Sequence, residues 1–283
     1  MKDSIIFQDG GEINRLAVQN RLFSSAEKPI YRQIMNGSGL TVLDIGCNNG
    51  GKTVDRFKCD NVNKVIGIEY HQKLVDSAQK KYGGDKFVFY CLNAESAGFI
   101  SQLNEILAEN NIESVDIIHI SLVLMHLNNP QSLLTKLRDI LSPDGKIIIV
   151  EAEDSASRLI PDKGNLFRDF MQLLKSDPWS GDRTCADKLP DYLNNAGYRR
   201  ISKHTAAITA GGTELQKKKD IIDVFFSYLP LDIKQLCRIY PDNAEYKRCM
   251  KWLDINYSTL TQEILKEKTY ISMGICVYIG YGR

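Results

Sequence analysis

The chain has 283 residues, of which 43% are hydrophobic and 25% charged, and its formal net charge is +1. This length suits one large domain or a domain with a cap, and the composition is ordinary for a soluble globular protein. The balanced charge does not favour nucleic acid or acidic lipid as a partner, and no apolar run approaches the roughly 20 residues that span a bilayer. The polar amino terminus does not resemble a secretory signal. Seven scattered cysteines without a CxxC pair indicate free thiols, so we expect a cytoplasmic protein.

Residues 12–36 carry apolar side chains at helical spacing and are predicted to form a helix, punctuated by Pro29 and Gly37. From residue 41 onward, short apolar runs alternate with helix-like segments. The predicted strands are TVLDIG, KVIGIE, KFVFYC, VDIIHIS and GKIIIVEAE. This alternation indicates βαβ units and a parallel sheet that is covered by helices on both faces.

The alternation stops after Glu153. Residues 154–183 are irregular, a helix should end at Gly197, and residues 213–268 should be mostly helical with breaks at Pro230 and Pro241. We therefore divide the chain into an amino-terminal helical segment (1–39), a core (40–153), a lid segment with a helix and a sixth strand (154–212), a helical cap insertion (213–268) and a final strand (269–283).

The stretch LDIGCNNGG ends the first predicted strand in a carboxylate and a loop of small residues. Such a loop lets a ligand approach the free N–H groups at the start of the next helix. Asn48 suits a left-handed backbone. Glu69 ends the second strand about 20 residues beyond the loop, where a ribose hydroxyl is bound in dinucleotide-type folds. Together these features predict a ligand that contains a nucleoside.

Asp44 indicates which nucleoside. A carboxylate two residues before Gly46 would repel a pyrophosphate, which argues against a nicotinamide-dependent oxidoreductase. S-adenosylmethionine has an ammonium group, a sulfonium and an adenosine but no phosphate, so it suits an acidic site. Asp44 could instead cap a helix or pair with a buried lysine.

Four motifs resemble those of class I S-adenosylmethionine-dependent methyltransferases of the small-molecule type. They are LDIGCNNG, VIGIEY, CLNAES and the run from VDIIHIS to GKIIIVE, and they cover residues 40–153. Asn48 replaces the family's middle glycine, Asn93 replaces its usual Asp, and Asp144 replaces a glycine of its PGG turn. The resemblance implies a doubly wound α/β fold, with a mostly parallel seven-stranded Rossmann-like sheet, an antiparallel last strand and helical cap insertions. It also implies the cofactor-binding set Asp44, Gly46, Cys47, Asn48, Gly50, Glu69, Tyr70, Asn93, Ala94 and Ser121.

The function that the resemblance implies is methyl transfer from S-adenosylmethionine to an O, N or C atom of a small-molecule acceptor, leaving S-adenosylhomocysteine. Long segments after the fifth and sixth strands favour an enclosed acceptor pocket lined by residues 154–183 and 213–240. The alternatives are a tRNA or protein methyltransferase and a non-catalytic S-adenosylmethionine-binding protein. The helical insertion could instead serve a homodimer. No acid cluster indicates a metal site.

His126 follows the fourth strand, at the sheet edge where ligands bind in open α/β folds, so it is the candidate general base. It could equally be a packed, hydrogen-bonded histidine. The basic run of residues 217–219 is interpreted as a solvated helix face, and Asn93 could serve only to build a turn.

Overall fold

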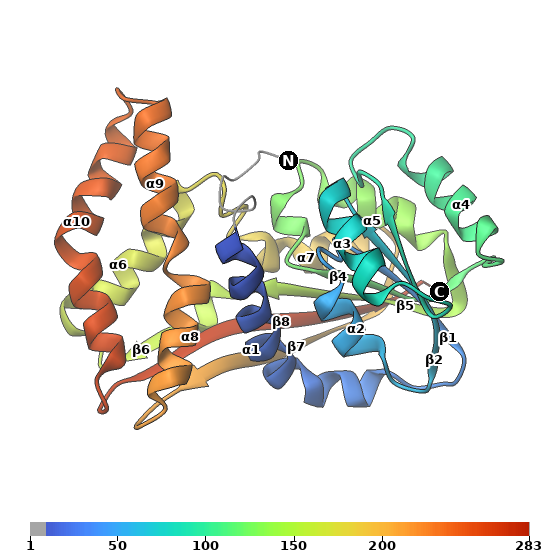
Figure 1. The fold of residues 1–283 in the computed structure, drawn as a ribbon, viewed down its shortest axis with the longest axis horizontal. Coiled ribbons are helices and arrows are strands. Elements are labelled where there is room, and N and C mark those ends of the chain that lie inside the picture. Colours follow the sequence, from blue (N-terminus) through green and yellow to red (C-terminus); the bar gives the residue numbers. More distant parts are fainter. Residues whose placement is uncertain (1–9, 283) are drawn as a thin grey trace. The chain divides into compact units, whose positions relative to one another are not determined.

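Five parallel strands alternate with helices in the first half of the computed structural model, which describes residues 10–282. They pair in the order β3-β2-β1-β4-β5 (Figure 1). The predicted doubly wound α/β fold is confirmed. The strands are β1 (Leu40–Ile45), β2 (Val62–Glu69), β3 (Phe87–Cys91), β4 (Val115–Ser121) and β5 (Leu141–Ala152). The helices between them are α2 (Gly51–Phe57), α3 (Gln72–Tyr82), α4 (Phe99–Glu109), the 3-10 helix η2 (Leu124–His126) and α5 (Pro130–Arg138).

The chain divides into two compact units. The sheet unit contains Glu27–Glu151, Cys185–Thr205 and the residues from Cys276 onward, and the helical unit contains the described residues up to Ala26, Ala152–Thr184 and Ala206–Ile275. Four elements have residues in both units, namely helix α1 (Gly10–Ile34) and strands β5, β7 (Arg199–Ala210) and β8 (Tyr270–Tyr281).

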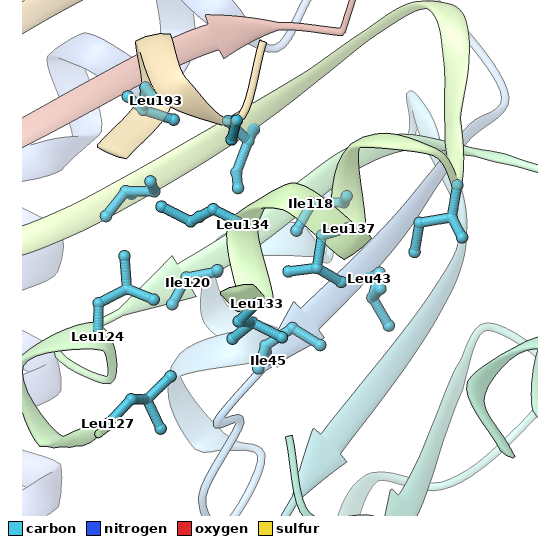
Figure 2. Close-up of a cluster of buried hydrophobic side chains, with 14 of the residues drawn as sticks. Leu43, Ile45, Ile118, Ile120, Leu124, Leu127, Leu133, Leu134, Leu137 and Leu193 are labelled. Carbon is cyan, nitrogen blue, oxygen red and sulfur yellow. The ribbon is translucent and has the colours of Figure 1, made fainter. Parts of the chain in front are cut away.

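The core of the sheet unit lies between α5 and the central strands. Figure 2 shows leucines of α5, among them Leu134 and Leu137, pointing toward Ile118 and Ile120 of β4. All four side chains are fully buried. Burying one such side chain is worth about 1.5–3 kcal/mol, so this face of α5 accounts for its docking on the sheet. Helix α5 begins at Pro130 because the side chain of Asn129 accepts a hydrogen bond from Ser132 N at 2.9 Å.

Helix α1 continues to Ile34 and passes through Pro29, which the sequence analysis took as a point of interruption. A proline inside a helix removes one backbone hydrogen bond. The helix continues because Glu27, Tyr31 and Ile34 on either side of the proline are buried in the folded chain.

The helical unit is built from helices around an aromatic core. Phe170 stacks on Phe226 with ring centroids 4.8 Å apart and lies 6.4 Å from Trp252. Helices α9 and α10 run side by side (Figure 1). Pro230 lies in the first turn of α9, where a missing N–H costs little, so it does not break the helix. The helices are α6 (Leu166–Leu173), α8 (Leu215–Phe225), α9 (Tyr228–Ile239) and α10 (Ala244–Leu265), with 3-10 turns η3 (Asp154–Ala156), η4 (Lys163–Asn165) and η5 (Leu174–Ser176).

The number of strands differs from the prediction. Within residues 10–282 the sheet has eight strands rather than seven, because β6 (Arg158–Ile160) pairs antiparallel with the start of β8. The expected sixth and last strands are β7 and β8, which pair with each other, and β8 neighbours β5 in the strand order. Helix α7 (Cys185–Asn195) precedes β7. Within residues 10–282, every helix is too short or too polar to cross a lipid bilayer.

Candidate functional site

The loop after β1 has no room for larger side chains. Gly46, Asn48 and Gly50 adopt φ angles of 76°, 50° and 74°, in the left-handed region that favours glycine and tolerates asparagine. A Cβ on Gly46 would lie 2.3 Å from the Val123 side chain, and one on Gly50 would lie 2.9 Å from the Phe89 ring. The loop is therefore a backbone surface at the start of α2, as the run of small residues indicates.

Glu69 ties this loop to the end of β2. Its Oε2 accepts a hydrogen bond from Asn48 N at 3.0 Å, and its Oε1 accepts from Tyr70 N at 2.8 Å and from His71 N at 3.0 Å. A carboxylate offers about four lone-pair positions, so a ribose hydroxyl would share Glu69 with the loop backbone. The side chain thus shapes the loop, and its role in binding the cofactor stays a prediction.

Asp44 lies beneath the loop, with 4% of its surface exposed. Its carboxylate accepts a hydrogen bond from Thr53 Oγ1 at 2.5 Å and lies 2.6 Å from His119 Nδ1, on the neighbouring strand β4. Burial lowers the pKa of His119 to about 4, so this ring is neutral at pH 7 and donates to Asp44 through Nδ1. Neither Thr53 nor His119 was foreseen from the sequence. His119 is a polar residue in the middle of a buried apolar strand, and that was the available signal.

A group of charged side chains adjoins Asp44. Lys52, the second residue of α2, donates a hydrogen bond to Ser121 Oγ at 2.6 Å, and its Nζ lies 3.6 Å from Glu27 Oε1. Glu27 also forms a buried ion pair with Arg56. Burial lowers the pKa of Lys52 to about 8, and nearby Asp44 and Glu151 oppose that shift. Lys52 therefore links two predicted site residues, since it donates a hydrogen bond to Ser121 and interacts with the charge of Asp44. The sequence analysis did not single out Lys52.

The residues predicted at the adenine edge lie at the ends of β2 and β3. The Tyr70 ring packs against His71 with centroids 4.6 Å apart. Asn93 Oδ1 accepts a hydrogen bond from Glu95 N at 2.9 Å, so its side chain builds a turn, with Ala94 inside it.

Cys47 is buried, which raises the pKa of its thiol well above the ordinary value. Cys47 therefore contributes its backbone rather than a reactive thiolate.

His126 is the last residue of η2, which follows β4. The turn is held by Glu151 Oε1, which accepts a hydrogen bond from Leu124 N at 3.0 Å. The catalytic role of His126 stays a prediction.

Residues 10–282 hold no group of three or more His, Cys, Asp or Glu side chains arranged to bind a metal. A cavity of about 280 Å³ is lined by Arg138, Gly197, Arg199 and Gly282. Because Arg138 ends α5 just before β5 begins, this cavity lies at the amino end of the strands, opposite the glycine-rich loop.

A doubly wound sheet, a left-handed glycine-rich loop after β1 and acids at the ends of β1 and β2 together define the Rossmann-like class of nucleoside-binding α/β proteins. Comparison with known families narrows this class. Residues 43–149 match the family described as "Methyltransferase domain". Residues 43–149 of the chain therefore form a methyltransferase domain.

Similar proteins agree with this assignment at low sequence identity. A demethylmenaquinone methyltransferase of Lactobacillus johnsonii is 23% identical over 205 residues, which are 68% of this chain and 81% of that protein. A crystal structure of a putative methyltransferase from Bacillus halodurans has a TM-score of 0.53 at 16% identity, over 90% of this chain and 97% of that one. A Haloferax volcanii putative methyltransferase, solved in complex with the Trm112 methyltransferase activator, has a TM-score of 0.54 at 12% identity, over 100% and 99% of the two chains. At such identities the solved structures show the shared fold.

Proposed function

We propose that this methyltransferase transfers the methyl group of S-adenosylmethionine to an O, N or C atom of a small-molecule acceptor, and that residues from 154–183 and 213–240 recognise that acceptor. The observation that carries the proposal is the helical unit. The connection between β7 and β8 contains the three helices α8, α9 and α10, whereas the median connection is about 4–6 residues long. A connection of this size is usually functional. The function proposed for it is to enclose a small acceptor, because an enclosed acceptor site excludes water from the reaction.

Two further observations support a small acceptor. The net charge of +1 gives the chain no general attraction for a polyanion such as tRNA. The Lactobacillus johnsonii relative is named for methyl transfer to demethylmenaquinone, a small molecule. We carry over only the class of acceptor, a small molecule, and propose no particular acceptor for this chain.

The cofactor roles of Asp44, Gly46, Glu69, Tyr70 and the other predicted residues belong to the same proposal. The division of the chain into five segments does too. Methyl transfer needs donor and acceptor held in line, and such orientation can supply about 7–11 kcal/mol of the barrier. The chain's own contribution is then chiefly to bind and orient, with His126 removing a proton where the acceptor has one to lose.

The test is an activity screen of the purified protein with S-adenosylmethionine, in which formation of S-adenosylhomocysteine is measured. One arm contains a panel of phenols, amines, carboxylic acids and quinols. The other arms contain bulk tRNA and a protein extract that has been freed of small molecules. We expect turnover in the first arm. Turnover confined to tRNA or protein would overturn the small-molecule proposal, and cofactor binding without turnover in any arm would favour a non-catalytic binding protein.

We also propose a cytoplasmic location and a homodimer. All seven cysteines are free, which suits a reducing compartment. Leu231 on α9 and Ile255 on α10 are 61% and 63% exposed, and apolar side chains exposed on neighbouring helices suit contact with a second copy. Light scattering of the purified protein, compared with a Leu231→Lys, Ile255→Lys variant, tests the dimer. A monomeric wild-type protein would refute it.

A further inference from the structure

Lys52 lies among buried carboxylates at the carboxyl ends of three strands. Its Nζ lies 3.6 Å from Glu27 of α1, and its charge interacts with Asp44 of β1 and Glu151 of β5. One hydrogen-bond acceptor of this ammonium group is the neutral hydroxyl of Ser121, at 2.6 Å. The lysine therefore lies among negative charges and donates to a neutral group as well.

The cluster carries an excess of negative charge. Glu27, Asp44 and Glu151 are carboxylates, and Lys52 and Arg56 are cations. His119, which contacts Asp44, is neutral at pH 7 because burial lowers its pKa to about 4. Three negative charges against two positive charges give these five side chains a net charge of −1 in a buried setting. S-adenosylmethionine carries a sulfonium, an ammonium and a carboxylate, so its net charge of one positive unit complements the cluster.

Lys52 is the member of this cluster that a ligand can reach. Its side chain is 17% exposed, whereas those of Glu27, Arg56 and Asp44 are 1%, 4% and 5% exposed. It also lies directly after the glycine-rich loop, as the second residue of α2. A carboxylate would accept a stronger hydrogen bond from the ammonium group than the Ser121 hydroxyl does.

We propose that Lys52 binds the carboxylate of the methionine part of S-adenosylmethionine, exchanging its contact with Ser121 for this ion pair. The inference rests on the assignment of S-adenosylmethionine as methyl donor and is independent of the acceptor. Glu27, Asp44 and Glu151 hold the lysine in place and supply the negative surroundings for the cofactor's cationic groups.

The test compares three ligands by calorimetry at about pH 7. S-adenosylmethionine and S-adenosylhomocysteine contain the methionine carboxylate, whereas 5′-methylthioadenosine contains the adenosine and sulfur without it. We expect Lys52→Met to weaken binding of the first two about 10- to 100-fold, the usual range for losing a hydrogen bond to a charged group, and to leave 5′-methylthioadenosine unchanged. Lys52→Arg should retain most of the affinity because it keeps the positive charge.

The matched control is Lys58→Met, which removes a lysine from the exposed end of the same helix, where it pairs with Asp55. Its affinities should equal those of the wild-type protein. An equal loss for all three ligands in Lys52→Met would mean that the lysine only supports the loop, and no loss would mean that it does not touch the cofactor. Either result overturns the proposal. Failure of the wild-type protein to bind any of the three ligands would instead contradict the donor assignment.

Discussion

Glu69 holds the loop in place, and it is also the residue proposed to bind the ribose of the cofactor. It accepts three backbone hydrogen bonds from the loop and the end of β2. We expect Glu69→Ala to weaken S-adenosylmethionine binding by at least tenfold, since hydrogen bonds to a charged group are worth about 1.5–3 kcal/mol. Glu69→Gln keeps an acceptor oxygen and should lose less. Isothermal calorimetry measures both, and an unchanged affinity in Glu69→Ala would remove this residue from the site.

The charge of Lys52 should make cofactor binding depend on pH. Burial lowers the pKa of its amine to about 8, against the opposing influence of Asp44 and Glu151. The lysine is charged below that pKa and neutral above it, so affinity for S-adenosylmethionine should fall as the pH rises from about 7 to about 9. Glu27 and Arg56 also face this group, but their ion pair is buried.

Lys52→Arg is the control for that pH profile, because arginine stays charged throughout this range. Its profile should be flatter than that of the wild-type protein, and any titration of the ligand itself would remain in both. The ratio of affinities for S-adenosylmethionine and 5′-methylthioadenosine isolates the effect. A variant profile as steep as the wild-type profile would assign the titration to another group.

His126 provides the kinetic prediction. If it takes a proton from the acceptor, His126→Ala should lower kcat about 10²- to 10⁴-fold while cofactor affinity stays the same, as expected for general base catalysis. His71, which packs against Tyr70 after β2, is the matched histidine, and His71→Ala should not lower kcat in this way. Steady-state kinetics and calorimetry on one preparation separate the two effects. A parallel loss of stability and activity in His126→Ala would indicate a packing role.

The sequence identifies some of these residues and misses others for a physical reason. Asp44, Gly46 and Glu69 stand at fixed distances from strand ends, and a local pattern reveals them. Glu27, Lys52 and Arg56 meet only because α1 packs on α2 in the folded chain, and no spacing along the sequence records that meeting. His119 could have been found by aligning β4 against β1, which places it directly opposite Asp44.

Among the elements, helix α1 depends on one buried ion pair. Glu27 and Arg56 are almost fully buried, and the guanidinium also lies 4.6 Å from the centre of the Tyr31 ring. We expect Glu27→Leu to destabilise the fold by about 3–5 kcal/mol, because it leaves a buried arginine without its counter-charge. Urea denaturation measures this loss.

The double variant Glu27→Leu, Arg56→Met is the control for that prediction. Replacing a buried ion pair with apolar side chains is often neutral or stabilising, so the double variant should be more stable than the single one. Additive losses in the double variant would show that the two side chains do not act as a pair.

Helices and strands were predicted correctly where the periodic pattern of apolar residues was long. The predictions failed where contacts between distant parts of the chain determine the structure. The five predicted strands and the helices between them are present because buried strands and amphipathic helices have distinct periods. Strand β6 has only three residues, too few to show a period. Lys218, interpreted as part of a solvated helix face, is instead buried, and its Nζ donates to the carbonyl oxygens of Gly212 and Lys266 at 3.2 and 2.7 Å. These acceptors lie in turns on either side of the long helical connection, which the local sequence does not reveal.

At the scale of the whole molecule, the helical unit contains a pair of buried acids, Asp177 and Asp232. Burial, and then the charge of Asp177, raise the pKa of Asp232 to about 8. Asp177 already accepts hydrogen bonds from Ser180 Oγ at 2.6 Å and Trp179 N at 2.9 Å, and Arg15 is the cation that acts on Asp232. The two carboxyl groups are therefore most stable when they hold one proton between them, and Asp232 carries it.

This pair should make the stability of the protein fall as the pH rises. A carboxyl group whose folded pKa lies above its unfolded value stabilises the fold at low pH, and that stability is lost between about pH 4 and about pH 8. Asp232→Asn cannot ionise, so its melting temperature relative to the wild-type protein should increase across that range. The exposed Asp242→Asn is the matched control and should show a constant difference. A constant difference in Asp232→Asn as well would contradict the shared proton.

The buried Glu27–Arg56 pair also bears on how this methyltransferase can be recombined with others. The residues that match the family begin at 43, but the counter-charge of Arg56 is supplied by a helix that lies before them in the chain. A cassette cut at the family boundary and grafted into another protein would carry an uncompensated arginine in its interior. The segment that can be grafted is therefore longer than the stretch of motifs. A domain exchange should give a stable protein only when the grafted segment includes both Glu27 and Arg56.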